Sequence, residues 1–533
     1  MLQSYTAARY ASGAALLFFF VLTLRAETVA FPPSQPYRAQ LAERGAVRDL
    51  SLRDAITTAL QSNLDIEMER DNRETSHTGI ANANSYYDPI FDLTGTALTS
   101  NIPVTNILQT GGFYSQITKA YTAVPSIQEN LPGGGTAQLS LNLSRTYTNS
   151  YYALINPVYG SVLGITITQP LWRGFRRTAA ERQIIVARLN ESMSESEFRQ
   201  RVAGTVEQVI NTYWRLAIAL ENYESQRQSR DVAVAEYEQT RKEQKQGQEG
   251  ALASQRSDVV AHDQSLTQAE VQVVQAENAL KRLLTASIMD PLWTTGIIAS
   301  DRPTPREPDM TEQDAVQTAL QRRPELEQLR LQLKQSEADV RYNRQETKPA
   351  VNLRLEAQST SYAGPIADTV DITGPLPAIT GAFGTTTRQA ISFDHPSLAA
   401  GLEIRLPLRN LAAKSQLAAA VIGERKLQAQ FRAAQEDILV DVRNAWQTIA
   451  VQRRNADSAV QSRKAAEERV HSEEAKHANE PGALDVLRAR KDFEEARKNE
   501  LQALVDYQLS LVTLQRAMNT LVDEQQIVLA RRK

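Results

Sequence analysis

The chain carries the same order of elements twice, and the first parts of the two copies align at an offset of 260 positions. After loops of different length, the alignment resumes at a smaller offset. The matching pairs include Asp54 and Asp314, Pro89 and Pro349, Pro170 and Pro407, Trp214 and Trp446, and Gly250 and Gly482. A tandem duplication predicts one structural unit used twice around a shared axis.

Each copy contains three helical segments, in which apolar residues recur at spacings of three and four. The predicted helices cover residues 52–87, 178–246 and 251–285 in the first copy, and 312–347, 411–478 and 483–521 in the second. A helix of about 70 residues is about 100 Å long. An opening and a closing helix, placed end to end, match one such length. We therefore predict a bundle of two unbroken and two composite rods with coiled-coil contacts.

Segments with a period of two follow each opening helix. Clear strand candidates lie at residues 90–99, 135–147 and 161–170 in the first copy and at 350–360 and 397–407 in the second, with a weaker one at 113–123. The glycine-rich turn 132–135 indicates a hairpin between two of them. Since both ends of each strand region join helices, each region must contain an even number of strands. The sequence leaves open whether the first region has two or four. The loops 148–160 and 361–396 are expected to be exposed connections.

The strands have one apolar and one polar side. Leu141, Leu353 and Leu402 are expected to face lipid. The residues expected to line an aqueous lumen are Arg354, Glu356, Glu403 and Arg405. Such alternation over about 10 residues is typical of a transmembrane β-barrel. After the N-terminal region, no run of about 20 apolar residues predicts a transmembrane helix, and a closed barrel is then the remaining way to cross a membrane.

The domain boundaries follow from these elements. They are a signal peptide (1–30), an N-terminal extension (31–50), the first repeat (51–285), a linker (286–310), the second repeat (311–523) and a C-terminal tail (524–533). An apolar run over 11–24, with small residues after it, indicates a cleaved secretory signal. With 59 basic and 62 acidic residues and no basic cluster, the chain does not suggest a nucleic-acid partner.

The chemistry of a cofactor or enzyme site is not evident in the sequence. The chain has no cysteine, and therefore no disulfide or thiolate metal site. His471 and His477 are spaced so that one helical turn does not bring them together, which argues against a metal site. Motifs for a nucleophile, a phosphate loop or a zinc protease are lacking as well. We expect no cofactor, no metal and no enzymatic activity.

Several local segments, in their order and duplication, resemble the TolC-like outer-membrane efflux protein family. They are Asp88-Pro89, the strand endings 168–175 and 406–409, and the segments 250–252 and 482–487. The resemblance implies a mixed α and β membrane protein, a homotrimer with one shared transmembrane β-barrel and a long α-helical coiled-coil barrel. It also implies an outer-membrane location, with helices in the periplasm that dock on a periplasmic adaptor and an inner-membrane transporter. The implied function is passive exit for substrates of tripartite efflux or type I secretion.

The resemblance also directs attention to the helix tips. In the family, acidic residues just after the second turn line a constriction; Asp485 matches the first such position, but Arg488 occupies the next. The candidate gate residues are therefore Asp485, Arg488, Arg256 and Asp258. Asp485 and Arg488 share a helix face and are expected to form a charge latch. Candidate adaptor contacts are Gly250, Ala251, Leu252, Gly482, Ala483 and Leu484.

Two other readings are compatible with long helices. A periplasmic coiled-coil adaptor needs a lipoyl-like β-domain between the hairpin halves, where this chain has amphipathic strand pairs. A secreted structural coiled-coil protein does not need those strands.

Overall fold

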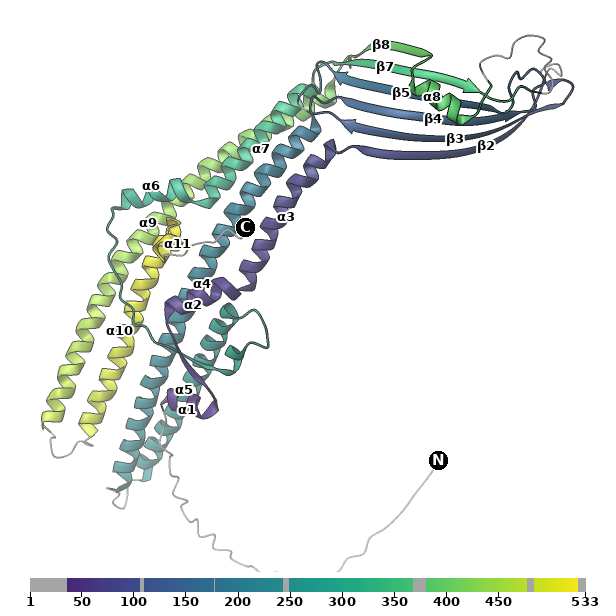
Figure 1. Cartoon of the computed structure of the whole chain (residues 1–533). Helices are drawn as coiled ribbons and strands as arrows, with labels where there is room; N and C mark the ends of the chain where they lie inside the picture. Colours follow the sequence, from purple (N-terminus) through teal and green to yellow (C-terminus); the bar gives the residue numbers. More distant parts are fainter. Residues whose placement is uncertain are drawn as a thin grey trace, which may run out of the picture.

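The computed structural model describes residues 36–105, 110–176, 178–242, 249–367, 380–476 and 484–525. An elongated bundle of helices joins a six-stranded sheet at one end (Figure 1). Within the described residues, no helix combines the length and the apolar character needed to cross a membrane.

Four long helices form the part of the bundle farthest from the sheet. They are α4 (Ala179–Lys242), α5 (Glu249–Leu284), α9 (Leu411–Lys476) and α10 (Leu484–Ala517). Helix α4 packs along both α5 and α10, and α10 packs along α9. Buried apolar residues recur along α4, among them Val202, Val206, Val209 and Tyr213. The 64 residues of α4 and the 66 residues of α9 give the rods the length expected from the sequence.

The two opening helices are each broken, and the prediction of continuous helices over 52–87 and 312–347 was wrong in this respect. Helix α2 (Leu52–Ser62) is followed by α3 (Leu64–Asn84), and α6 (Glu312–Arg322) is followed by α7 (Pro324–Glu346). The breaks lie at Asn63 and Arg323, which have nearly the same extended backbone angles.

The cause of the break differs between the copies. The Asn63 side chain accepts hydrogen bonds from the backbone N–H groups of Asp65 and Ile66, as an N-cap does. Arg323 precedes Pro324, whose ring disfavours a helical conformation in the residue before it. Because the two breaks are 260 residues apart, they belong to the duplicated unit. Asparagine at an N-cap and proline at a helix start were the available signals.

The N-terminal extension and the linker meet in space. Strand β1 (Val47–Leu50) pairs in parallel with β6 (Gly296–Ala299), and α1 (Tyr37–Arg44) packs beside them. The short helix η3 (Pro291–Thr294) precedes β6. Tyr37, Leu50 and Ile297 are buried in the same core cluster as α4. These two segments, expected only as connections, therefore form a small domain around the middle of the bundle (Figure 1).

The large sheet is antiparallel throughout, in the order β2-β3-β4-β5-β7-β8. Its strands are β2 (Ile90–Pro103), β3 (Ser115–Asn130), β4 (Thr136–Thr148), β5 (Val158–Pro170), β7 (Ala350–Ala363) and β8 (Pro396–Arg405). The short helix η1 (Ser85–Tyr87) leads into β2. Within the part of the chain that the structure describes, the first copy thus has four strands in this sheet and the second has two, which decides the number left open by the sequence.

Two of the four strands have no counterpart among the described residues of the second copy. Strands β2 and β7 are each 14 residues long and begin 260 residues apart, while β5 ends at Pro170 and β8 ends just before the matching Pro407. We call the remaining pair, β3–β4, the inserted hairpin. Its turn contains Gly134, whose φ of +85° favours glycine.

The strand register sorts the side chains into two faces, because directly opposed residues point to the same side of a sheet. Leu353 of β7 lies opposite Leu402 of β8 and Gln169 of β5. Leu141 of β4 lies opposite Leu163 of β5. Because Leu163 and Gln169 are an even number of residues apart on β5, all these side chains point to the same side of the sheet. We call their side the apolar face. Arg354, Glu356, Glu403 and Arg405 all lie on the other side, the polar face. The grouping expected from the sequence agrees with the register.

A helix that was not expected, α8 (Phe383–Ile391), packs against β5 and β7. The hydroxyl groups of Thr386 and Ser161 are 2.7 Å apart, so α8 covers the apolar face at the end farther from the bundle. Strand β5 begins within the predicted loop 148–160, and α8 lies within the predicted loop 361–396. Each of these two regions therefore contains all or part of a regular element in addition to a connecting loop.

Candidate functional site

Both edges of the large sheet are open among the residues that the structure describes in the single chain. All ten residues of β8 are exposed, and the side chains of β2 are exposed at every position except Ser100. The inner strands are mostly half-buried. An open edge presents unpaired backbone N–H and C=O groups, which need water or another strand as partners. The two edge strands are therefore the surfaces of this sheet that can accept a neighbouring chain.

The polar face bears two ion pairs near the bundle. Arg354 pairs with Glu356 on β7, and the Arg405 guanidinium lies 2.8 Å from the Glu403 carboxylate on β8. The Asn352 amide also donates to Glu403, at 3.3 Å, and so links the two strands. The four residues predicted for the lumen are thus brought together on neighbouring strands. The charges of these four residues balance within β7 and β8.

The tip of the α9–α10 hairpin is tied to the first repeat by Arg488. Its Nε donates to Glu236 Oε1 on α4 at 2.9 Å. Asp485 lies exposed in the first turn of α10, three residues earlier, and Arg256 and Asp258 are exposed on α5. The observed partner of Arg488 is therefore a carboxylate from the other hairpin.

The tip residues expected to contact an adaptor have different environments. Gly482 and Ala483 lie outside the described residues. Gly250 is exposed in the first turn of α5, followed by Ala251. Leu252 packs against the small cluster of Ala233, Tyr237 and Val259, and Leu484 is half-buried. Leu252 therefore helps to hold α5 against α4.

Arg488 belongs to a line of ion pairs between α4 and α10, which we call the inter-repeat seam. The pairs are Glu236 with Arg488 at 2.9 Å, Glu221 with Arg497 at 3.0 Å, and Glu207 with Arg516 at 2.5 Å. Burial raises the pKa of the Glu207 and Glu221 carboxyls, and the partner guanidinium opposes this shift in each case. Sequence reasoning missed the seam because its partners are far apart in the chain and belong to different repeats.

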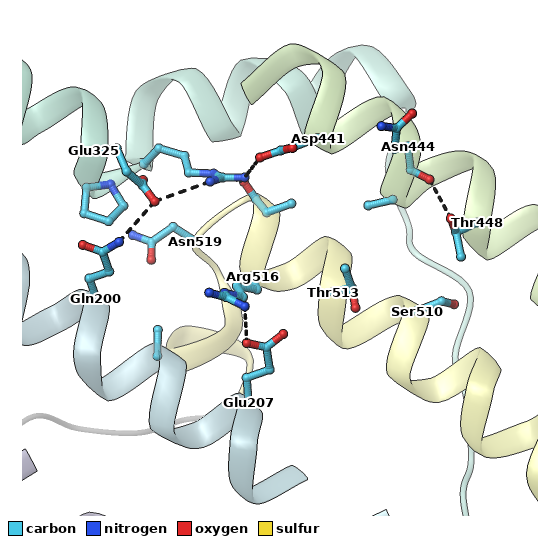
Figure 2. Close-up of a pocket in the computed structure, with 15 residues that line it drawn as sticks. Gln200, Glu207, Glu325, Asp441, Asn444, Thr448, Ser510, Thr513, Arg516 and Asn519 are labelled. Atoms are coloured by element: carbon cyan, nitrogen blue, oxygen red, sulfur yellow. Dashed lines mark hydrogen bonds and ion pairs between the residues drawn. The ribbon is translucent and has the colours of Figure 1, made fainter. Parts of the chain in front are cut away.

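The seam ends, toward the sheet, at a cavity of about 480 Å³ between α4, α7, α9 and α10 (Figure 2). Arg323, at the break between α6 and α7, reaches across it. Its guanidinium donates to the backbone oxygen of Ala517 at 2.7 Å and lies 3.3 Å from the Asp441 carboxylate. The Gln200 amide of α4 donates to Glu325 at 3.3 Å. The helix break thus positions an arginine that joins the start of α7 to the end of α10 and to the middle of α9.

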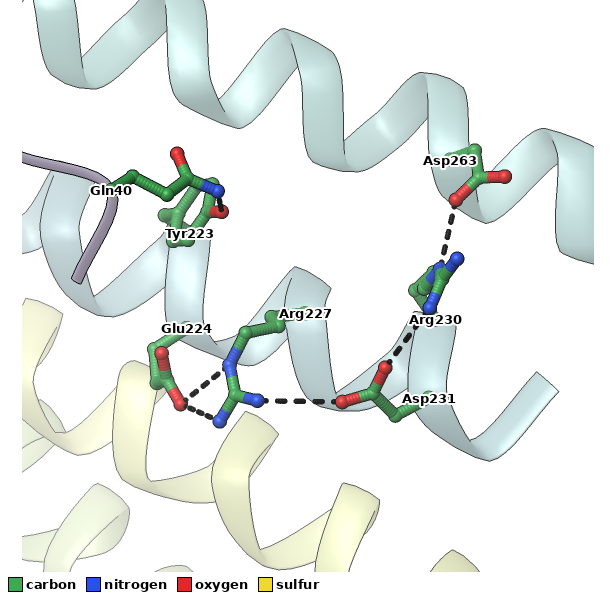
Figure 3. Close-up of polar contacts among 7 residues, drawn as sticks. All are labelled: Gln40, Tyr223, Glu224, Arg227, Arg230, Asp231 and Asp263. Carbon is green, nitrogen blue, oxygen red and sulfur yellow. Dashed lines mark hydrogen bonds and ion pairs between the residues drawn. The ribbon is translucent and has the colours of Figure 1, made fainter. Parts of the chain in front are cut away.

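Helix α4 makes polar contacts on several sides (Figure 3). Arg230, only 5 % exposed, donates from Nε to Asp263 Oδ1 of α5 at 2.9 Å. Arg227 pairs with Glu224 and Asp231 along α4 itself. Gln40 of α1 donates to the Tyr223 hydroxyl at 2.7 Å. These contacts, with the seam, make α4 the helix that holds α5, α10 and the N-terminal segment together.

A sequence comparison finds one family model that is similar to part of the second half of the chain. Residues 315–520 match the model of the outer membrane efflux protein family. No curated protein sequence matches the chain.

Several solved outer membrane channels have a similar fold. The CmeC outer membrane channel of Campylobacter jejuni is 14 % identical, with a TM-score of 0.62 and 98 % of each chain covered. The open state of the MtrE outer membrane channel of Neisseria gonorrhoeae is 17 % identical, with a TM-score of 0.56, and 88 % of this chain and 89 % of that chain are covered. VceC, an outer membrane protein of Vibrio cholerae, is 16 % identical, with a TM-score of 0.55 and coverage of 91 % and 98 %.

The sequence match covers the second repeat, and the fold match extends over most of the chain. Residues 315–520 are similar in sequence to the outer membrane efflux protein family, and nearly the whole chain is similar in fold to solved outer membrane channels, so the resemblance to the TolC-like outer-membrane efflux protein family is confirmed.

Proposed function

We propose that three copies of this chain form an outer-membrane channel that gives passive exit to substrates. A periplasmic adaptor and an inner-membrane transporter deliver the substrates to the helix tips, and the chain itself catalyses no reaction. The observation that carries this proposal is the six-stranded sheet with an apolar face and two exposed edges. Neither a periplasmic adaptor nor a secreted coiled-coil protein requires such a sheet.

The direction of the edge strands supports closure into a barrel. Strand β2 leaves the helical bundle and β8 returns to it, so β8 of one copy can pair with β2 of the next in antiparallel fashion. Three six-stranded sheets then give an 18-stranded barrel, a size that leaves an aqueous channel. In this arrangement the apolar face meets lipid and the polar face lines the lumen.

The first prediction concerns assembly. Because an open sheet edge is not tolerated in lipid, the protein extracted from outer membranes should be a trimer. Native mass spectrometry in detergent should give three times the mass of the mature chain, and fractionation should recover the protein with the outer membrane. A stable, folded monomer in the membrane fraction, or a fully soluble protein, would refute the proposed channel.

The second prediction concerns the gate. We infer that opening separates the α9–α10 hairpin from α4 at the tips, with Asp485, Arg256 and Asp258 as further charges at this end. The Arg488–Glu236 pair resists this movement, and a partly exposed pair of this kind contributes about 0.2–1 kcal/mol in each copy. Changing Arg488→Ala should therefore raise the conductance of the isolated trimer in planar bilayers.

Arg490→Ala is the matched control for the gate. Arg490 pairs with Glu474 of α9 at 2.7 Å, so its ion pair lies within the α9–α10 hairpin and does not cross to α4. Its loss should leave the conductance near that of the unchanged protein. Equal effects of the two substitutions would show that the contact between hairpins does not restrain the tips.

A further inference from the structure

The inserted hairpin carries a basic and aromatic patch on the apolar face. Lys119 of β3 lies directly opposite Tyr147 of β4, and Tyr121 lies directly opposite Arg145. Lys119 and Arg145 are therefore diagonal neighbours, which in antiparallel sheets lie about 7–8 Å apart and within reach of long side chains. Tyr121 is 52 % exposed and Tyr147 is 46 % exposed, and both cations are exposed as well.

The aromatic part of the patch continues across the sheet. Arg145 lies opposite Tyr159 of β5, and its guanidinium carbon is 5.9 Å from the centre of the Tyr159 ring. The Tyr159 ring in turn meets Phe383 of α8 edge to face, with ring centres 4.9 Å apart. Rings at this level of a membrane barrel are typical of the interface between hydrocarbon and headgroups.

The distance of the patch from the bundle, measured along the barrel axis, agrees with the position of that interface. Tyr159 lies eleven residues before Pro170, where β5 rejoins the bundle. At about 3.3 Å per residue and a tilt of about 40°, this strand segment rises about 28 Å, close to the apolar band of about 25 Å in outer-membrane barrels. The residues of β4 closer to the bundle on the same face are Leu143, Leu141, Leu139 and Ala137. The patch therefore begins where the apolar band ends, on the side away from the periplasmic helices.

The charge of the patch is uncompensated on its own face. Lys119 and Arg145 are the cations that the six strands place on the apolar face, and Glu129 is the acid. Glu129 lies opposite Ala137, near the bundle and at the other border of the apolar band. Cations at the outer border of the band favour an anionic partner in the outer leaflet. Since arginine and lysine both bind phosphate strongly, a phosphorylated headgroup fits this charge.

We propose that the inserted hairpin binds the phosphate groups of outer-leaflet glycolipid through Lys119 and Arg145. In this site Tyr121, Tyr147 and Tyr159 contact the lipid where its sugars meet its acyl chains. This inference rests on the proposed function, because it requires the apolar face to meet lipid. It goes beyond that function in assigning a lipid site to two strands that have no counterpart in the described part of the second repeat. The site is then a feature added to the duplicated unit.

The test uses the full-length trimer in detergent, titrated with bisphosphorylated lipid A and followed by native mass spectrometry. The double variant Lys119→Gln with Arg145→Gln should bind this lipid about 25-fold more weakly, since each charge near a membrane surface contributes about fivefold. The pair Lys119→Arg with Arg145→Lys keeps both charges and should bind nearly as well as the unchanged protein. Arg354→Gln, on the polar face, should have no effect.

The outcomes separate the two proposals. Equal binding of bisphosphorylated and dephosphorylated lipid A by an intact trimer would overturn the glycolipid site and leave the channel standing. The glycolipid site would also be overturned, and the channel left standing, if Arg354→Gln weakened lipid binding as much as the double variant does. A chain that forms no trimer in the outer membrane would overturn the channel, and the glycolipid site with it.

Discussion

Replacing Glu277 by alanine should destabilise the protein by about 3–5 kcal/mol, because it leaves a buried ammonium group without its counter-charge. Glu277 and Lys281 are only 5 % and 4 % exposed, and the Lys281 ammonium is 2.8 Å from Glu277 Oε1. The same oxygen accepts the backbone N–H of Ile297 at 2.9 Å, so the substitution also removes the hydrogen bond that fixes β6 to α5. Thermal and urea unfolding of the detergent-solubilised protein would measure the loss.

The exposed pair Arg306–Asp309 provides the control. Its side chains are 88 % and 86 % exposed, so Asp309→Ala should change the stability by less than about 1 kcal/mol. The double change Glu277→Leu with Lys281→Met should recover part of the stability, because it removes both buried charges together. A loss below 1 kcal/mol for Glu277→Ala would show that the buried pair does not hold the small domain.

The second large effect is expected at a row of residues within the apolar face. Six apolar residues lie opposite one another across the whole sheet at this level: Phe91, Ile127, Leu139, Ile165, Ala357 and Leu398. If this row lies near the middle of the membrane, Ile165→Arg should cost about 2–4 kcal/mol. The fraction of protein that folds as a trimer in lipid vesicles, measured during urea titration, would report the cost.

The neighbouring residue on β5 gives a matched comparison. Thr166 lies on the polar face, opposite Gln138 and Glu356, so Thr166→Arg places the same new charge toward the proposed lumen. It should cost little and should instead change ion selectivity. If Thr166→Arg proved the more damaging of the two, the assignment of lipid and lumen to the two faces would have to be exchanged.

Most of the secondary structure could be anticipated because its signals are local. The ends of α4 and α9 lie within a few residues of the predicted ends, since both are long segments with regular helical periodicity. The breaks at Asn63 and Arg323 had local signals too, an N-cap residue and a following proline, but the continuous apolar pattern outweighed them. Strand β3 was underestimated because its alternation is weak, and its pairing with β2 and β4 decides its length.

The candidate site was anticipated less completely, for a physical reason. Alternation along one strand groups Arg354 with Glu356, and duplication suggests which strands are equivalent. The partner of Arg488 is Glu236, which lies 252 residues away in the other repeat. No local pattern encodes such a pair, because it depends on the packing of α10 against α4. The same holds for the row that brings Tyr121, Arg145 and Tyr159 together across three strands.

The sequence by itself determined the duplication, the long helices and the amphipathic strands, because each depends on residue spacing within one segment. Only the tertiary structure decided the strand count, the small domain built from β1 and β6, and the inter-repeat seam. These features depend on contacts between segments far apart in the chain, where register and packing choose among partners of similar composition. In this protein, local periodicity defines the elements, and the contacts between repeats define the surfaces on which the proposed function depends.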